Sequence, residues 1–181
     1  MLLVCAATAR ELLSALPEQA LGPAPGAACG PAAQTGLPEQ ELLPLHLGLP
    51  ALACITGVGP VNAALGMGLA LAGARQAGHA VSLVLNVGVG GSLNAALKYG
   101  DIAIADRLVQ HDVDTSALGD KKGFVSTVNR LRFPLSERVS DDLERALVDT
   151  GARAVRGAIA SGDQFVSEPD AKAAIAERFG A

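Results

Sequence analysis

Short apolar runs alternate with longer segments of helical pattern along this chain, and that alternation is typical of an α/β fold. The run at 81–85 is rich in branched residues, as expected of a strand that is buried on both faces of a sheet. Ile102 and Ile104 occupy alternate positions in the next apolar run, which predicts a further strand. We expect strands at residues 2–5, 49–55, 81–85, 101–109 and 154–160.

Helices are indicated by the spacing of apolar residues and by the residues at their ends. The segment from Pro60 to about Ala77 has no polar face, so we expect it to be buried, and such a helix suits a subunit interface. Ser140 is expected to cap a later helix. Ser167 and Asp170 are expected to form a capping box that opens the last one.

A helical pattern also follows the first strand directly, with Leu12, Leu13 and Leu16 expected on one face. Glu11 therefore lies just beyond the carboxyl end of a strand, where ligands bind in open α/β sheets. A glutamate in a first helical turn is equally a favourable partner for the helix dipole. The residue pattern alone favours that structural role.

Flexible and polar residues gather after the two central strands. Glycines that allow a backbone to approach a ligand follow the 81–85 strand, at Gly88, Gly90 and Gly91. The 101–109 strand ends in a polar cluster formed by His111, Asp112 and Asp114. That spacing is compatible with metal ligands, but it is more typical of a hydrogen-bonded structural cluster, and we expect no metal.

The composition narrows the class of protein. The 181 residues are 50% hydrophobic, which suits one domain over 1–181, and residues 17–44 hold six of the ten prolines, which predicts a long loop insertion with a short edge strand. A net charge of −4 without a basic run argues against nucleic acid as a partner. No apolar run approaches the roughly 18 residues of a membrane span. Three cysteines without CxxC spacing point to reducing cytoplasm.

Four strings resemble one family: TGVG, NVGVGGSLNAALKYGDIAIAD, HDVDTSALGD and SGDQFV. They are similar to segments of the nucleoside phosphorylase and nucleosidase superfamily, most closely to the 5′-methylthioadenosine/S-adenosylhomocysteine nucleosidases. The resemblance implies a three-layer α/β/α fold with a central mixed, twisted sheet. It also implies a purine nucleoside as substrate, no cofactor, and a homodimer.

The resemblance also implies roles for individual residues. Glu11 matches the catalytic glutamate of the family, which orients the attacking nucleophile. Residues implied to bind the substrate are Thr56, Gly57, Val58, Val89, Gly90, Gly91, Phe165 and Val166, of which Phe165 and Val166 contact the base. The resemblance also implies a loop that crosses the dimer interface and closes over the 5′-substituent bound by the partner subunit, and its residues are His111, Asp112 and Leu118.

Several functions compete within this resemblance. Phosphorylases of the superfamily place an arginine where this chain has Asn86, and often a serine where it has Val89, so a neutral site favours water over phosphate. Futalosine hydrolase is the runner-up among hydrolases, because it shares the AAT opening and a GVGPVN-like segment. The string HDVDTSALG favours the methylthioadenosine nucleosidases instead, although Leu118 stands where many relatives have an aromatic residue.

The family also implies two segments that this sequence does not contain. One is a Glu-Met-Glu segment that binds the ribose, and the other is a Ser-Asp pair whose aspartate protonates the purine. Breaking an N-glycosidic bond needs an acid for the leaving base as well as a carboxylate for the nucleophile. We therefore expect a C-terminally truncated chain that lacks the final strand and helix of the fold and is nearly inactive, with a nucleoside-binding fragment as the non-enzymatic alternative.

Overall fold

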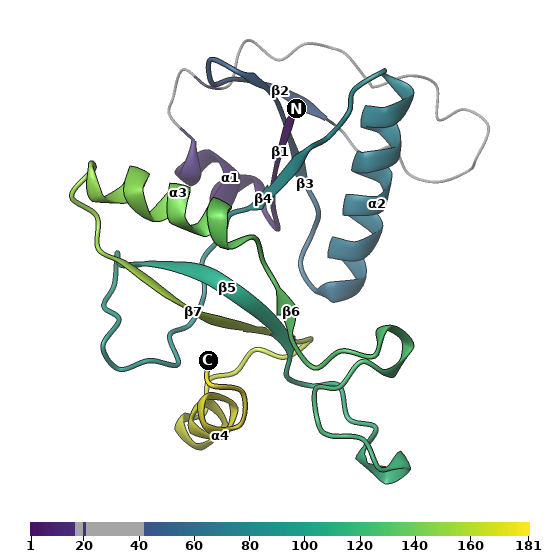
Figure 1. The fold of residues 1–181 in the computed structure, drawn as a ribbon, viewed down its shortest axis with the longest axis vertical. Helices are drawn as coiled ribbons and strands as arrows, with labels where there is room; N and C mark the ends of the chain where they lie inside the picture. The colour runs from purple at the N-terminus through teal and green to yellow at the C-terminus, as the bar shows by residue number, and fades with distance from the viewer. Residues whose placement is uncertain (17–19, 21–41) are drawn as a thin grey trace. The chain divides into compact units, whose positions relative to one another are not determined.

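A computed structural model of the protein describes residues 1–16, 20 and 42–181, which form two compact units, Met1–Gly90 and Gly91–Ala181 (Figure 1). The predicted loop at 17–44 falls mainly outside the described residues. Among the residues that are described, no helix combines the length and the apolar character needed to cross a membrane.

The first unit is built on a four-stranded sheet with the strand order β2-β3-β1-β4. Its strands are β1 (Leu2–Ala6), β2 (Leu43–His46), β3 (Pro50–Ile55) and β4 (Leu83–Asn86). β1 pairs in parallel with β3 and β4, whereas β2 pairs antiparallel with β3 at the edge. β2 overlaps only the last two residues of the 17–44 segment in which a short edge strand was expected.

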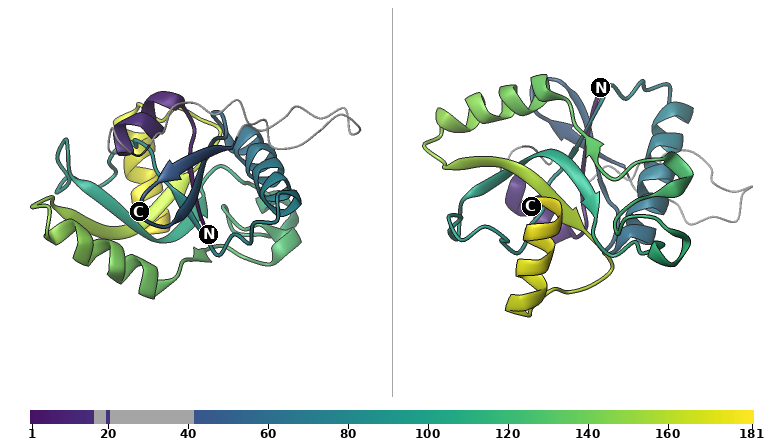
Figure 2. Two further views of the ribbon diagram at one scale, coloured as in Figure 1. Left: turned by 90° about the horizontal axis from the view of Figure 1, so that it is seen from above. Right: turned by 60° about the horizontal axis from the view of Figure 1, so that its bottom comes forward.

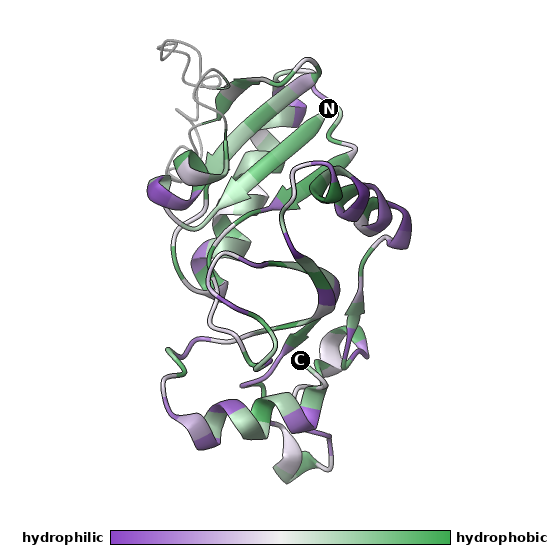
Figure 3. Cartoon of the chain, turned by 90° about the vertical axis from the view of Figure 1, so that its left-hand side faces the viewer, coloured by the Kyte–Doolittle hydropathy of each residue, from purple (hydrophilic) through white to green (hydrophobic). Residues whose placement is uncertain are grey.

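Two helices cover this sheet, α1 (Ala9–Ala15) and α2 (Pro60–Gln76). Successive side chains of a strand point to opposite faces, so Leu3 and Cys5 join the core cluster that includes Ala70 and Ala74 of α2. Val4 and Ala6 join the other cluster, with Leu12 of α1. The unit therefore has three layers, α/β/α, and Figure 3 shows its strands coloured predominantly as hydrophobic.

The ends of α2 are as predicted, but its burial is not. Gly59 is the N-cap with a φ of 92°, Pro60 is the first helical residue, and the C-cap is Ala77. Only Gly66, Ala70 and Ala74 are buried, because a helix places a single face on a sheet. Val61 is 75% exposed on the opposite side.

Two other predictions of burial in this unit were also wrong. Leu13 is 57% exposed while Leu12 is buried, since consecutive helical residues are rotated by about 100° and do not share a face. Leu83 and Val84 are exposed, and β4 lies at the edge of the sheet, where it pairs with β1 alone among the described residues. The branched run at 81–85 is a strand, but not one covered on both faces.

The second unit contains a three-stranded sheet in the order β6-β5-β7. Its strands are β5 (Ile102–Gln110), β6 (Phe133–Pro134) and β7 (Ala154–Ser161). β7 runs parallel to β5, with a bulge between Ala105 and Arg107, and β6 pairs antiparallel with β5. The strands of the chain are thus hydrogen-bonded in two mixed sheets rather than in one central sheet.

The helices of the second unit are α3 (Glu137–Val148) and α4 (Pro169–Phe179), and α3 packs against β5 and β7 (Figure 2). Ser136, not Ser140, caps α3 by accepting a hydrogen bond from the N–H of Val139 at 3.4 Å. Ser140 is buried, and its hydroxyl donates to the carbonyl oxygen of Ala105 at 3.2 Å, which ties α3 to β5. The prediction placed the cap one turn too late, because Ser140 also precedes an acidic pair and an apolar stripe.

The start of α4 also differs from the prediction. Its N-cap is Glu168 without a side-chain capping bond, and Pro169 occupies the first turn. Ser167 instead donates its hydroxyl to the Glu168 carboxylate at 3.2 Å, so it forms no capping box with Asp170. At the other end Phe179 is 2% exposed, and the chain leaves the helix through Gly180 with a φ of 65°.

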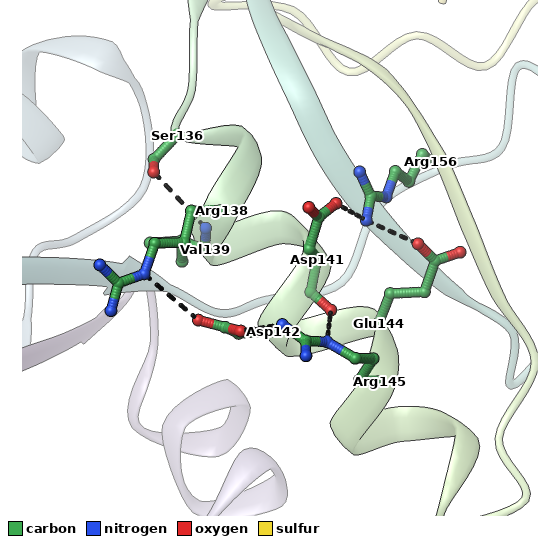
Figure 4. Close-up of polar contacts among 8 residues, drawn as sticks. All are labelled: Ser136, Arg138, Val139, Asp141, Asp142, Glu144, Arg145 and Arg156. Atoms are coloured by element: carbon green, nitrogen blue, oxygen red, sulfur yellow. Dashed lines mark hydrogen bonds and ion pairs between the residues drawn. The ribbon is translucent and has the colours of Figure 1, made fainter.

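Ion pairs link α3 to β7 (Figure 4). Arg156 of β7 contacts Asp141 at 2.5 Å and Glu144 at 2.7 Å, and Arg145 pairs with Asp142 along the helix. Solvent screens exposed pairs of this kind, so they contribute little to the stability of the protein. Because α3 begins at Glu137, Asp141 and Asp142 lie beyond its first turn, and both form ion pairs with arginines.

Candidate active site

The carboxyl ends of three parallel strands meet in the first unit. Beyond the regular ladder, the N–H of Val87 donates to Cys5 O at 2.9 Å, and the N–H of Thr56 donates to Ala6 O at 2.9 Å. The N–H of Gly57 continues the pattern to Ala7 O at 3.1 Å. The segments that follow β3, β1 and β4 are therefore held side by side at the sheet edge where ligands bind in such folds.

Glu11 lies at this edge, as the third residue of α1. Thr8 is the N-cap, and the two residues form a capping box in which the Glu11 N–H donates to Thr8 Oγ1 at 3.3 Å. In return, Glu11 Oε2 accepts hydrogen bonds from the Thr8 N–H at 3.0 Å and from the Thr8 hydroxyl at 2.9 Å. Glu11 Oε1 accepts a further hydrogen bond from the N–H of Val89, 78 residues away, at 3.1 Å.

These donors lower the pKa of Glu11 from its ordinary value of 4.5. The Val89 N–H is the largest cause, partial burial opposes it, and the hydroxyl and N–H of Thr8 act in the same direction as Val89. Glu11 is therefore a carboxylate at neutral pH. Its Oε2 has two donors and its Oε1 has one among the described residues, so Oε1 keeps the greater capacity for a further donor such as water.

The glycines after β4 have different roles. A Cβ at Gly88 would lie 3.2 Å from Glu11 Oε1, so the absent side chain leaves room for the carboxylate. A Cβ at Gly90 or Gly91 would meet nothing within 4 Å in the structure. The side chain of Val89 is 87% exposed, and it is the backbone of this residue that contacts Glu11.

The segment after β3 is fixed mainly by its backbone. The Thr56 hydroxyl lies 3.3 Å from the carbonyl oxygens of both Ala6 and Gly57 and can donate to either, and Gly57 has a φ of 86°. The Asn62 amide donates to Val58 O at 2.7 Å, which closes the turn into α2, and the Val58 side chain is 69% exposed. Thr56, Gly57 and Val58 thus lie beside the strand that leads to Glu11.

Asn86 ends β4 opposite Cys5 of β1. Its Oδ1 accepts a hydrogen bond from the Cys5 thiol at 3.3 Å, which fixes the orientation of the amide. Burial raises the pKa of that thiol to about 11, so it remains a protonated donor. The position carries a neutral amide, as the sequence shows.

The remaining candidate residues lie in the second unit, at the ends of β5 and β7. The N–H of His111 donates to Ser161 O at 2.9 Å, and Asp112 Oδ2 accepts from the N–H of Asp163 at 2.6 Å. A Cβ at Gly162 would lie 2.5 Å from His111 Nε2 and 2.8 Å from Asp112 Oδ2, so only glycine fits there without displacement. The structure therefore brings His111 and Asp112 against the start of the SGDQFV loop.

Phe165 and Leu118 are both available to a ligand. The Phe165 ring is 98% exposed in the loop after β7, next to the partly buried Val166. Leu118 is 83% exposed in the 3₁₀ turn Ser116–Leu118.

Asp114 belongs to a separate contact. It pairs with Lys122 at 2.8 Å and accepts a hydrogen bond from Ser116, and Lys122 is the largest cause that holds its pKa far below the usual range. Across residues 1–16, 20 and 42–181, no three His, Cys, Asp or Glu side chains are grouped as a metal site. Asp114 therefore contacts Lys122 and Ser116, whereas Asp112 accepts from the N–H of Asp163.

Sequence reasoning missed Thr8 and the bond between Asp112 and Asp163. The first could have been found, because Thr8-x-x-Glu11 before an apolar run is the capping-box signature. The second had no signal, since it joins residues 51 positions apart whose proximity depends on the pairing of β5 with β7.

Comparison with known protein families identifies the class of protein to which this chain belongs. The family model described as the phosphorylase superfamily matches residues 41–181, and the chain belongs to that superfamily. The expected family and the α/β fold are thereby confirmed.

Comparison with individual proteins gives a narrower set of relatives than the superfamily does. The chain is 35% identical over 123 residues to a 5′-methylthioadenosine/S-adenosylhomocysteine nucleosidase of Geobacillus kaustophilus, a match covering 67% of this chain and 50% of that protein. The chain thus spans about half the length of the curated relatives it matches.

Solved structures agree with the fold. The nucleosidase of Neisseria meningitidis in complex with methylthio-immucillin-A has a TM-score of 0.78 and 26% identity, over 99% of this chain and 71% of that one. The futalosine hydrolase of Helicobacter pylori has a TM-score of 0.81 and 24% identity, over 99% of this chain and 71% of that one. The second of these likenesses concerns the fold alone.

Proposed function

We propose that this protein is a purine nucleoside N-glycosidase that hydrolyses 5′-methylthioadenosine and S-adenosylhomocysteine to adenine and a thioribose product. The observation that carries the proposal is the ionised Glu11 carboxylate, which three hydrogen bonds hold at the carboxyl end of the sheet. The proposed substrates are supported by the similarity of the chain to 5′-methylthioadenosine/S-adenosylhomocysteine nucleosidases.

In the proposed reaction Glu11 orients the attacking water. Oε1 accepts a hydrogen bond from the water, whose oxygen adds to C1′ of the ribose while the bond from C1′ to N9 breaks. The electron pair of that bond leaves on N9 of adenine, which takes up a proton from solvent, while the attacking water gives up a proton to Glu11, and Glu11 then returns that proton to solvent. The state between is oxocarbenium-like, so a fixed anion beside C1′ stabilises it.

Water is the proposed nucleophile rather than phosphate. A phosphate dianion is bound most strongly by a charged donor such as arginine, and Asn86 offers only a neutral amide. The exposed side chain of Val89 adds no donor. Added phosphate should therefore leave the rate of adenine release unchanged, and ribose-1-phosphate among the products would contradict this proposal.

We assign the other candidate residues as follows. Phe165 stacks on the purine and the backbone at Val166 reads its edge, because the ring is exposed and the chain has few aromatic residues. Thr56, Gly57 and Val58 are assigned to the part of the pocket beside the ribose and the attacking water, and the substrate-binding residues also include Val89, Gly90 and Gly91. Leu118 is assigned to the 5′-substituent bound by the partner subunit of the proposed dimer, with His111 and Asp112 supporting the loops.

We further propose a cytoplasmic homodimer that acts in methionine salvage, the process that consumes methylthioadenosine. The dimer is supported by the uncovered apolar side of α2, where Val61 and Leu65 are exposed. The compartment is supported by Cys5 and Cys54, which are free thiols whose pKa values burial raises to about 11.

Binding tests the base assignment without depending on catalysis. Calorimetry should show tighter binding of 5′-methylthioadenosine than of 5′-methylthiouridine, and Phe165→Ala should remove most of the difference, because stacking on an aromatic ring contributes about 1–3 kcal/mol per base. Tyr99→Ala is the matched control, since that ring is equally exposed in the same unit. Equal binding of both nucleosides would refute the base site.

Adenine release tests the catalytic assignment; it is followed by chromatography with the protein in excess over nucleoside, so that the slow turnover expected of a chain without the catalytic acid can still be measured. Glu11→Gln should lower the rate by about 10²- to 10⁴-fold, the usual contribution of a general base. Glu137→Gln changes another glutamate in a first helical turn and should leave the rate unaltered. A Glu11→Gln variant as active as the Glu137→Gln variant would exclude Glu11 from the chemistry.

A further inference from the structure

We infer that Thr8 is a positioning residue for Glu11. Thr8 donates hydrogen bonds to one oxygen of the Glu11 carboxylate, so that the other oxygen is presented to the nucleophile. The inference rests on the proposed function of Glu11. It concerns a residue that contacts the carboxylate rather than the substrate.

Thr8 contributes both of its donors to the same oxygen. Its N–H and its hydroxyl reach Glu11 Oε2 at 3.0 and 2.9 Å, while the hydroxyl oxygen accepts the Glu11 N–H at 3.3 Å. A hydroxyl can donate once and accept at the same time, so all three bonds are compatible. Threonine is also β-branched and stiff about χ1, so the hydroxyl keeps its direction.

A capping box alone does not account for this arrangement. Capping requires Thr8 and Glu11 to satisfy each other's backbone N–H groups at the start of α1, and nothing more. Here the same carboxylate also accepts the N–H of Val89, from the loop after β4, at 3.1 Å. The carboxylate therefore bridges two segments of the chain, which contact its two oxygens separately.

The two carboxylate oxygens become inequivalent as a result. Oε2 is engaged by two donors from Thr8, and Oε1 by the single N–H of Val89 among the described residues. Gly88 allows the approach, because a Cβ there would lie 3.2 Å from Oε1. Water bound at Oε1 would thus meet an anion whose orientation does not need to be reset before each reaction.

The test is an NMR titration of the Glu11 carboxyl in the wild type and in Thr8→Val, Thr8→Ser and Thr8→Gly, with Glu11→Gln used to assign the signal. Valine keeps the shape and the backbone N–H but lacks the hydroxyl, so the pKa of Glu11 should rise, and serine should restore it. Glycine is tolerated at N-caps and also lacks the hydroxyl, so it gives the same test if the valine variant does not fold.

Ser136→Ala is the matched control, because it removes the N-cap of α3, where no glutamate accepts from the capping residue. It should cost similar helix stability and leave the Glu11 pKa unaltered. An unchanged Glu11 pKa in folded Thr8→Val or Thr8→Gly would overturn the inference.

Kinetics provide the second readout. Thr8→Val should lower adenine release about tenfold, as expected for one hydrogen bond to a charged group, and should move the acidic limb of the pH profile upward, with serine rescuing both. A merely structural cap would leave that limb in place. If Glu11→Gln retains full activity, the proposed function fails, whereas the pKa comparison still decides whether Thr8 controls the carboxylate.

Discussion

The contact between α2 and the segment after β3 leads to a quantitative prediction about Gly66. A Cβ at this buried position would lie 2.9 Å from Thr56 Cα and 3.0 Å from Thr56 O. Neither atom can move freely, because the Thr56 N–H is bonded to Ala6 O at 2.9 Å. Gly66→Ala should therefore force the helix away from the sheet.

Gly68 provides the matched control, since it lies in the same helix, is exposed, and has nothing within 4 Å of an added Cβ. Both substitutions gain about 1 kcal/mol from the higher helix propensity of alanine. Only Gly66→Ala also carries an overpacking cost, typically about 1–3 kcal/mol. The two variants should therefore differ by about 1–3 kcal/mol in unfolding free energy, with Gly68→Ala the more stable.

The assay must report on the first unit. The chain has no tryptophan, and its one tyrosine, Tyr99, lies in the second unit, so intrinsic fluorescence is unsuitable. Hydrogen exchange of the β1 and β3 amides gives the local free energy of opening, measured at concentrations where sedimentation shows a monomer. If Gly66→Ala protects these amides as well as Gly68→Ala does, the proposed close packing on Thr56 is wrong.

Three further predictions follow from other contacts. The pKa of Glu11 is lowered on folding, so the ionised carboxylate adds to the stability of the folded protein. The difference in unfolding free energy between the wild type and Glu11→Gln should therefore be full above pH 4.5 and should disappear as the pH falls through the lowered pKa. Denaturant titrations at several pH values measure this difference, and it would be constant with pH if the hydrogen bonds were absent. Gly162→Ala should displace Asp112 from the Asp163 N–H and weaken nucleoside binding in calorimetry, whereas Gly157→Ala, with open space around its Cβ, should not; equal affinities would count against the loop anchor. Leu65→Glu should dissociate the proposed dimer in sedimentation experiments, and an unchanged mass would place the interface elsewhere.

Local signals in the sequence were enough to locate most elements of the fold. The apolar runs predicted β1, β3, β5 and β7 to within about one or two residues, because burial and backbone sterics act on each run independently of its neighbours. Gly59 and Pro60 predicted the start of α2 for the same reason, since a missing Cβ and a fixed φ are properties of single residues. The motif strings also predicted the superfamily.

Other features depended on which segments meet in space. Nothing near Ser140 in the sequence shows that its hydroxyl reaches Ala105 O, and nothing near Leu65 shows that its side of α2 is uncovered. The sequence places Glu11 at a strand end, but only the pairing of β1 with β4 brings the Val89 N–H to its carboxylate. Strand order and register decide such long-range contacts, and these are set by the free energy of the whole packed sheet rather than by any one segment.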